Sequence, residues 1–304
     1  MKHMRVRSSA LPPFFRVWTA LLLLTLSSLA PAANDTGVFW LAQKDNQTVY
    51  LLGSVHLASS DFYPLRDTIE QAYGKSDALV VEADVLAAES DLALQQKIMQ
   101  ASVYQGQRTL KDELSADVYR QLLAWLEQRK IPEAMFIRQR PAIAMVSMSM
   151  VELRAQGLEP GLGIDRHFLL QAHKSDKPVL ELEGIVAQLE MLNNLDNPDL
   201  LLQQTLEQLE EVESFVPRMA TAWKSGDMEA LHELVIAEGL REHPEYASLY
   251  DVIFFDRNRT MAEKITDFSD RHRTLFVIVG AGHLAGDKSV LEGLKQRGFQ
   301  LEQL

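Results

Sequence analysis

The chain has 304 residues, of which 47% are hydrophobic and 24% charged, a composition typical of a globular protein with material for one large domain or two small ones. Its formal net charge of −12 would repel a phosphate backbone, so nucleic acid is not an expected partner. The absence of cysteine excludes disulfides, thiolate metal sites and a cysteine nucleophile.

The N-terminal residues 1–32 have the pattern of a secretory signal. Basic residues precede the apolar run Val17 to Ala30, and the small residues Ala30 and Ala32 indicate cleavage after Ala32, with Ala33 as the alternative. A retained anchor is the alternative, but the run is shorter than the ~20 residues that a spanning helix needs. We therefore expect a single mature domain, residues 33–304, that is periplasmic or secreted and free of the membrane.

The first elements of the mature chain predict a β-hairpin. The β-rich runs Val38 to Gln43 and Thr48 to Val55 flank the polar residues 44–47. A helix-like stretch over residues 65–73 and a short buried strand over residues 78–81 follow.

Residues 86–172 are predicted to be mostly helical. Ser115 is the expected N-cap of one helix, and Pro141 fits the first position of another. Met145, Met148 and Met150 of the second helix could belong to a stripe that binds a cofactor or a peptide. We interpret them as core residues, because gap-filling methionines are far more common.

The C-terminal half combines further helices with short strands. Helices are predicted over 164–173, 253–265 and 290–296, a long helical region over 189–240, and strands over 179–182, 274–279 and 299–304. The expected architecture is an α/β fold, in which strands from both ends of the chain form one central mixed sheet and a large helical insertion lies between them.

Polar residues directly follow four of the predicted strands. They are His56, Glu82, Glu183 and His283. If these strands are parallel neighbours, all four residues lie at the sheet edge where α/β proteins bind ligands. The two histidines belong to a repeated Gly-x-x-His pattern, in which a glycine after each strand allows a close approach of another chain or a ligand.

Two imidazoles and two carboxylates suit two kinds of chemistry. They could bind a divalent metal such as zinc, manganese, iron or cobalt, which activates water. A metal-free Glu/His pair could instead act as a general base, with an arginine stabilising an oxyanion. A serine hydrolase has little support, because Gly-x-Ser-x-Gly is absent and Ser54 is the one suitably placed serine.

Several of these polar residues also have purely structural interpretations. Glu183 could cap the helix that follows Gly184, and Asp165 stands at an expected helix N-cap. Arg257 and Asn258 lie on a predicted helix among other charged residues, where a surface ladder of ion pairs is the common arrangement.

A set of short motifs extends the pattern along the whole mature chain: Leu52-Gly53-Ser54-Val55-His56, Val80-Val81-Glu82-Ala83-Asp84, Gly163-Ile164-Asp165, Pro178 to Glu183, Asp256-Arg257-Asn258, and Val279 to Gly286. In this order and spacing the chain from Val38 to Leu304 resembles the TraB/GumN family, which includes the pheromone-shutdown proteins and the TIKI proteases.

The resemblance implies an α/β core like that of the erythromycin-esterase and haem-binding ChaN-like group. TIKI proteins are described as metal-dependent proteases that use the paired Gly-x-x-His motifs and a strand-end acid. By position, the resemblance implies His56, His283 and Glu82 as metal ligands, with Arg257 and Asn258 as further family positions.

We therefore expect an exported metal-dependent hydrolase, most simply a peptidase, that uses zinc, manganese or cobalt and acts on a peptide or small-molecule substrate. Glu82, Arg257 and Asn258 would be catalytic. The alternatives are a non-catalytic protein that captures a peptide or haem, and a metal-free esterase-like hydrolase. The residues expected to contact substrate are Gly53, Ser54, Gly280, Glu183 and Asp165.

Overall fold

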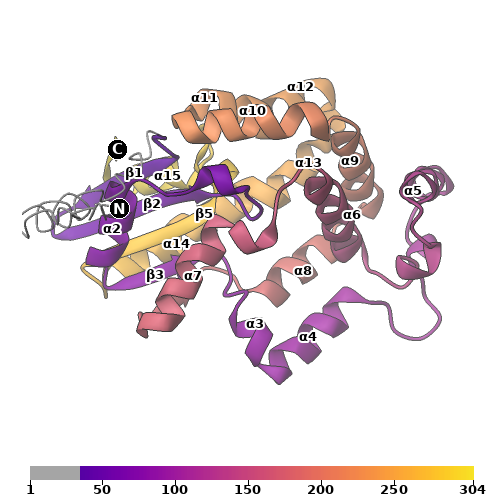
Figure 1. Ribbon diagram of the computed structural model, residues 1–304, viewed down its shortest axis with the longest axis horizontal. Helices are drawn as coiled ribbons and strands as arrows, with labels where there is room; N and C mark the ends of the chain where they lie inside the picture. The colour runs from indigo at the N-terminus through magenta and orange to yellow at the C-terminus, as the bar shows by residue number, and fades with distance from the viewer. Residues whose placement is uncertain (1–34) are drawn as a thin grey trace, which may run out of the picture.

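A computed structural model describes residues 35–304, so the predicted signal segment and its cleavage point lie outside the described residues. The protein has a six-stranded sheet with the order β4-β3-β5-β2-β1-β6 (Figure 1). The strands are β1 (Phe39–Lys44), β2 (Gln47–Ser54), β3 (Ala78–Val81), β4 (Val179–Glu181), β5 (Thr274–Gly280) and β6 (Gln300–Gln303).

The sheet is mixed, as predicted. β2, β5, β3 and β4 are consecutive parallel neighbours, whereas β1 runs antiparallel to β2 and to β6. The register pairs Ser54 with Gly280, and Val81 with both Ile278 and Glu181. The four strands that end in polar residues therefore have their carboxyl ends side by side.

Helices from both halves of the chain cover the sheet. They are α2 (Asp67–Lys75), α7 (Ile164–Ser175), α14 (Asp256–Ser269) and α15 (Val290–Gln296). α2 and α7 lie on the viewer's side of the sheet in Figure 1, where Tyr73 and Phe168 pack with ring centroids 5.0 Å apart against Phe276 of β5. α14 packs closely on α15, with Ala262 against Gly293. The core of the sheet layer is thus continuous from one end of the chain to the other.

The helical insertion lies beside the carboxyl ends of the strands and has an apolar core of its own (Figure 1). Ser115 caps α5 by accepting a hydrogen bond from Val118 N at 3.3 Å, and Pro141 opens α6, so both sequence predictions are confirmed. The region predicted as one helical stretch over 189–240 is divided into shorter helices. The insertion contains α3 (Ala87–Ser90), α4 (Leu92–Ser102), α5 (Ala116–Arg129), α6 (Pro141–Ala155), α8 (Ile185–Asn193), α9 (Pro198–Glu210), α10 (Val212–Ser225), α11 (Met228–His232), α12 (Glu238–Glu242) and α13 (Ala247–Tyr250).

Two π-helical segments lie close to the sheet edge. They are Glu233–Ala237, between α11 and α12, and Asp251–Phe255, directly before α14. Both segments press on the turn after β5, because a Cβ atom at Gly282 would lie 2.9 Å from Val235 and from Phe254. Such segments often occur at functional sites, where the extra residue re-aims the side chains that follow.

Candidate active site

A cavity of about 650 Å³ opens between the carboxyl ends of the parallel strands and the helical insertion. Its polar lining includes Ser54, His56, Glu82, Asp165 and Arg257. The size is that of a small-molecule binding pocket. The position agrees with the strand-end rule, although it also brings in Asp165, which comes from the start of α7.

Glu82 is buried and fully hydrogen-bonded at this edge. Its Oε1 accepts from the backbone N–H of Gly280 at 2.6 Å, and its Oε2 accepts from Arg257 Nη2 at 2.6 Å and from Gln188 Nε2 at 3.0 Å. Burial alone would raise the pKa of Glu82, but the charges of His283 and Arg257 lower this pKa to about 2. Glu82 is therefore a carboxylate throughout the physiological pH range.

Arg257 joins the two strand-end glutamates. Its Nε and Nη2 donate to Glu183 at 2.9 and 2.8 Å, and Nη2 also donates to Glu82. Gln188 of α8 bonds both carboxylates as well, reaching Glu183 Oε2 at 2.8 Å. The structural alternative of a surface ladder does not hold for Arg257, because its side chain is only 15% exposed. Glu183 does not cap α8 either, since no side chain caps that helix.

His283 is 4% exposed, follows β5 in the turn Ala281–Leu284, and is not among the residues that line the cavity. Asn258 Nδ2 donates to the carbonyl of Lys288 at 2.8 Å, so Asn258 Oδ1 must accept from His283 Nδ1, at 2.6 Å. Burial lowers the pKa of His283 to about 4. At neutral pH its Nε2 is thus an acceptor, and it lies 3.9 Å from Glu82 Oε1, a second acceptor.

His56 stands on the cavity wall with 62% of its side chain exposed. Its Nδ1 lies 3.2 Å from Asp165 Oδ2, and the Asp165 charge raises the pKa of His56 to about 9. Asp165 is in the first turn of α7 but does not cap it, because Gly163 occupies the N-cap position. Gly163 is required there, since a Cβ atom would lie 2.4 Å from the carbonyl oxygen of His56.

The other predicted site residues have more varied positions. Ser54 Oγ is buried, lacks a hydrogen-bond partner among the described residues, and lies on the cavity wall. Gly53 packs tightly on Val38, where a Cβ atom would come within 2.7 Å, and Gly280 supports Glu82. Asn258 is 2% exposed and holds His283. Gly53, Gly280 and Asn258 are not among the described residues that line the cavity.

Sequence reasoning missed Gln188 and the pairing of Asp165 with His56. Nothing in the sequence singles out Gln188, which reaches the site only through the packing of α8. The break in the helical pattern at Gly161-Leu162-Gly163 could have indicated the pairing of Asp165 with His56, because it marks where α7 begins beside His56. The core interpretation of the methionines was also incomplete, since Met145 and Met150 line the cavity.

The donor set suits a cation in part. Both histidines have Nδ1 beside an oxygen, the arrangement that orients Nε2 in metal-binding histidines. Two facing acceptors, His283 Nε2 and Glu82 Oε1, also favour a cation or a proton donor near them. Within residues 35–304, however, no group of three or more histidine, cysteine or acidic side chains is placed to hold a metal ion.

Comparison with known proteins places these features in a wider group. The model of the TraB/PrgY/gumN family matches residues 38–303. The uncharacterized protein YbaP of Escherichia coli strain K12 is 27% identical over 253 residues, covering 82% of this chain and 89% of YbaP. Metalloprotease TIKI1 of Danio rerio is 22% identical over 329 residues, and metalloprotease TIKI2 of Xenopus tropicalis is 23% identical over 331. Each match covers 90% of this chain, but 64% and 61% of the TIKI proteins. No solved structure matches.

Proposed function

The chain belongs to the TraB/PrgY/gumN family, and we propose that it is an exported hydrolase that cleaves an amide or ester bond with the help of a divalent metal ion. The names of the TIKI relatives support a peptide bond as the target. The chain spans less than two thirds of those proteins, so their activity comes to it only as part of this proposal.

The observation that carries the proposal is the meeting of buried His283 with Glu82, which lines the end of a cavity. The Nε2 atom of His283 lies 3.9 Å from Oε1 of Glu82. His56 projects from the wall of the cavity. Oxygen acceptors hold the Nδ1 atoms of both imidazoles. At neutral pH this leaves His283 Nε2 as an acceptor, whereas His56 Nε2 would have to release its proton for a metal ion to bind.

In this proposal His56 and His283, with Glu82, would hold zinc, manganese or cobalt. The bound metal would polarise a carbonyl and make water a better nucleophile at neutral pH. Water adds to the acyl carbon, the bond to nitrogen or oxygen breaks, and the leaving group departs with a proton.

The surrounding side chains orient these groups. Asp165 and Asn258 fix the two imidazole rings, and Arg257 holds Glu82 in place. Ser54 lines the cavity, and its buried Oγ, which has no hydrogen-bond partner among the described residues, would donate to a developing oxyanion.

A metal-free hydrolase is the second candidate, and one observation favours it. Glu82 already accepts hydrogen bonds from Gly280, Gln188 and Arg257, and no third ligand group completes the set in the described part of the chain. Glu82 with a histidine would then act as the general base. Capture of a peptide or haem without turnover stays as a third possibility that the same experiment tests.

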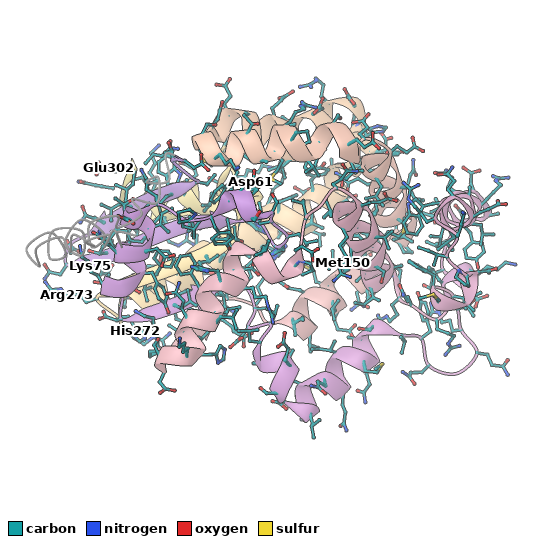
Figure 2. The ribbon with its side chains drawn as sticks, in the orientation of Figure 1. Asp61, Lys75, Met150, His272, Arg273 and Glu302 are labelled. Atoms are coloured by element: carbon teal, nitrogen blue, oxygen red, sulfur yellow. The ribbon has the colours of Figure 1, made fainter. Side chains whose placement is uncertain are left out.

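The deciding experiment combines metal analysis with cleavage assays on purified residues 33–304. We expect about one divalent ion per chain, loss of peptide cleavage after chelation, and recovery on adding zinc, manganese or cobalt. His56→Ala should lose both the ion and the activity. His272→Ala is the matched control, because His272 lies at the opposite, amino end of β5 (Figure 2).

The other outcomes separate the candidates. Full cleavage in chelator that disappears in Glu82→Gln would overturn the metal and support the metal-free hydrolase. Tight stoichiometric binding of peptide or haem without product would overturn hydrolysis.

A further inference from the structure

The two ends of the cavity differ sharply in chemistry. All charged residues that line it, His56, Glu82, Asp165 and Arg257, lie near the strand ends. The far wall is built by the insertion helices α6, α8 and α10, and along it the lining side chains other than Ser149 and Gln188 are apolar. Representative apolar residues of this wall are Ile143, Val146, Met150, Leu189, Phe215 and Met219.

Part of this wall packs within the insertion, since Ile143 contacts the cluster around buried Leu189, but Val146 and Met150 of α6 keep exposed surface. On α6 the lining residues Ile143, Val146 and Met150 recur at helical spacing, so they form one stripe. Figure 2 shows Met150 on the side of α6 that faces the sheet. Val146 is 40% exposed, although an apolar side chain of this size is normally buried in a core.

A helical wall also offers no partners to a peptide backbone. The N–H and C=O groups within a helix bond one another, so only side chains can donate or accept. An extended peptide buried there would therefore leave its own backbone groups without hydrogen bonds, which is unfavourable. A hydrocarbon chain has no such groups, and flexible methionines such as Met145 and Met150 can adapt to its shape.

We propose that the substrate carries a long hydrocarbon chain, of the fatty-acyl kind, which lies along α6, α8 and α10 with its carbonyl carbon at the polar end of the cavity. This inference rests on the proposed function for the reacting end. It adds the substrate class: an acyl ester or an N-acyl amide, R–CO–X, where X is an oxygen or nitrogen group. Hydrolysis consumes one water and gives R–COOH and H–X.

The test measures binding apart from turnover. Fluorescent cis-parinaric acid, its methyl ester and its glycine amide are titrated into Glu82→Gln, so that hydrolysis does not remove the probe. We expect saturable fluorescence enhancement with all three probes, because they share the chain. A preference for the ester or for the amide would identify which kind of acyl bond the substrate contains.

Two substitutions at Met150 locate the binding. Met150→Trp, made in the Glu82→Gln protein, fills the cavity and should weaken binding at least tenfold. Met150→Gln keeps the length but adds an amide, and should weaken it severalfold. Met135→Trp and Met135→Gln are the matched controls, because Met135 is 64% exposed and does not line the cavity. Circular dichroism establishes that each variant is folded.

Three results would overturn the inference. They are an absence of saturable binding, equal binding by the Met150 and Met135 variants, and displacement of the probe by an acetylated, amidated leucine-rich peptide at lower concentration than by palmitate. Failure of the proposed function looks different, since the hydrocarbon chain would then bind to the wild type and no acyl bond would be cleaved.

Discussion

Glu82 is held as an anion in a buried position, and this has a consequence for stability in acid. Its ordinary pKa of 4.5 applies to the unfolded chain, whereas its pKa in the folded protein is lowered to about 2. The unfolded state therefore takes up a proton first as the pH falls. Stability from this group is present above pH 4.5 and is lost as the pH falls toward 2.

We predict that Glu82→Gln flattens the dependence of the unfolding free energy on pH between 4.5 and 2, in the presence of chelator. Urea denaturation at several pH values measures this dependence. Glu82→Ala should be more severe and cost roughly 3–5 kcal/mol at pH 7, because it removes one partner of the buried Arg257 ion pair. An unchanged pH slope in Glu82→Gln would show that this carboxylate is not the group that titrates.

Asn258 offers a second test at the scale of single residues. Its Oδ1 fixes the ring of His283, so Asn258→Ala should lower kcat about 10–100-fold while KM changes little. Asn258→Asp keeps an oxygen acceptor and should recover part of the activity. Asn46→Ala, in the hairpin turn, is the control. A fall in stability with unchanged kcat in the folded fraction would contradict this positioning role.

At the scale of elements, the joint between Pro160–Leu162 and α7 places His56 beside Asp165. Gly163 permits this contact, since a Cβ atom there would lie 2.4 Å from the His56 carbonyl oxygen. Gly163→Ala should therefore destabilise the fold by about 1–3 kcal/mol and reduce activity. Gly161→Ala is a close control from the same motif, because nothing lies within 4 Å of its Cβ position. Equal thermal unfolding of the two variants would contradict the close-approach argument.

The polar residues that follow the predicted strands pointed to the candidate site, because the apolar strands determine the order of the sheet and therefore which residues share its edge. His56, Glu82, Glu183 and His283 follow parallel neighbours, and their strands predict one shared edge. The pairing of Arg257 with the glutamates depends instead on how α14 leaves a π-helical segment, and hydrophobic periodicity carries no signal for that register.

The role of α6 shows the same limit. The sequence pattern of its apolar stripe is the same whether the helix packs into a core or lines a cavity. Met148 is fully buried, whereas the nearby Met145 and Met150 line the cavity. Only the relative placement of the insertion and the sheet distinguishes the two environments. The family resemblance supplied the expected ligands, and the likeness to the ChaN-like group stays a prediction.

At the scale of the whole molecule, no helix within residues 35–304 is long and apolar enough to cross a membrane. The proposed export therefore depends on residues 1–32. We predict that the exported protein begins at Ala33, which N-terminal sequencing of the periplasmic or secreted fraction can check. Ala32→Leu should block cleavage and keep the protein at its full length. An unprocessed wild-type chain would contradict this expectation.

The central place of β5 in the sheet gives the site a built-in order of assembly. β5 lies between β2 and β3, yet its pairing of Thr274 with Thr48 joins opposite ends of the chain. At about 5–20 residues per second, a ribosome completes the early strands well before it reaches His283. A partly synthesised chain lacks both its middle strand and one of its two site histidines. We expect such a chain to stay inactive and unfolded, which would suit the export and the hydrolase activity proposed above.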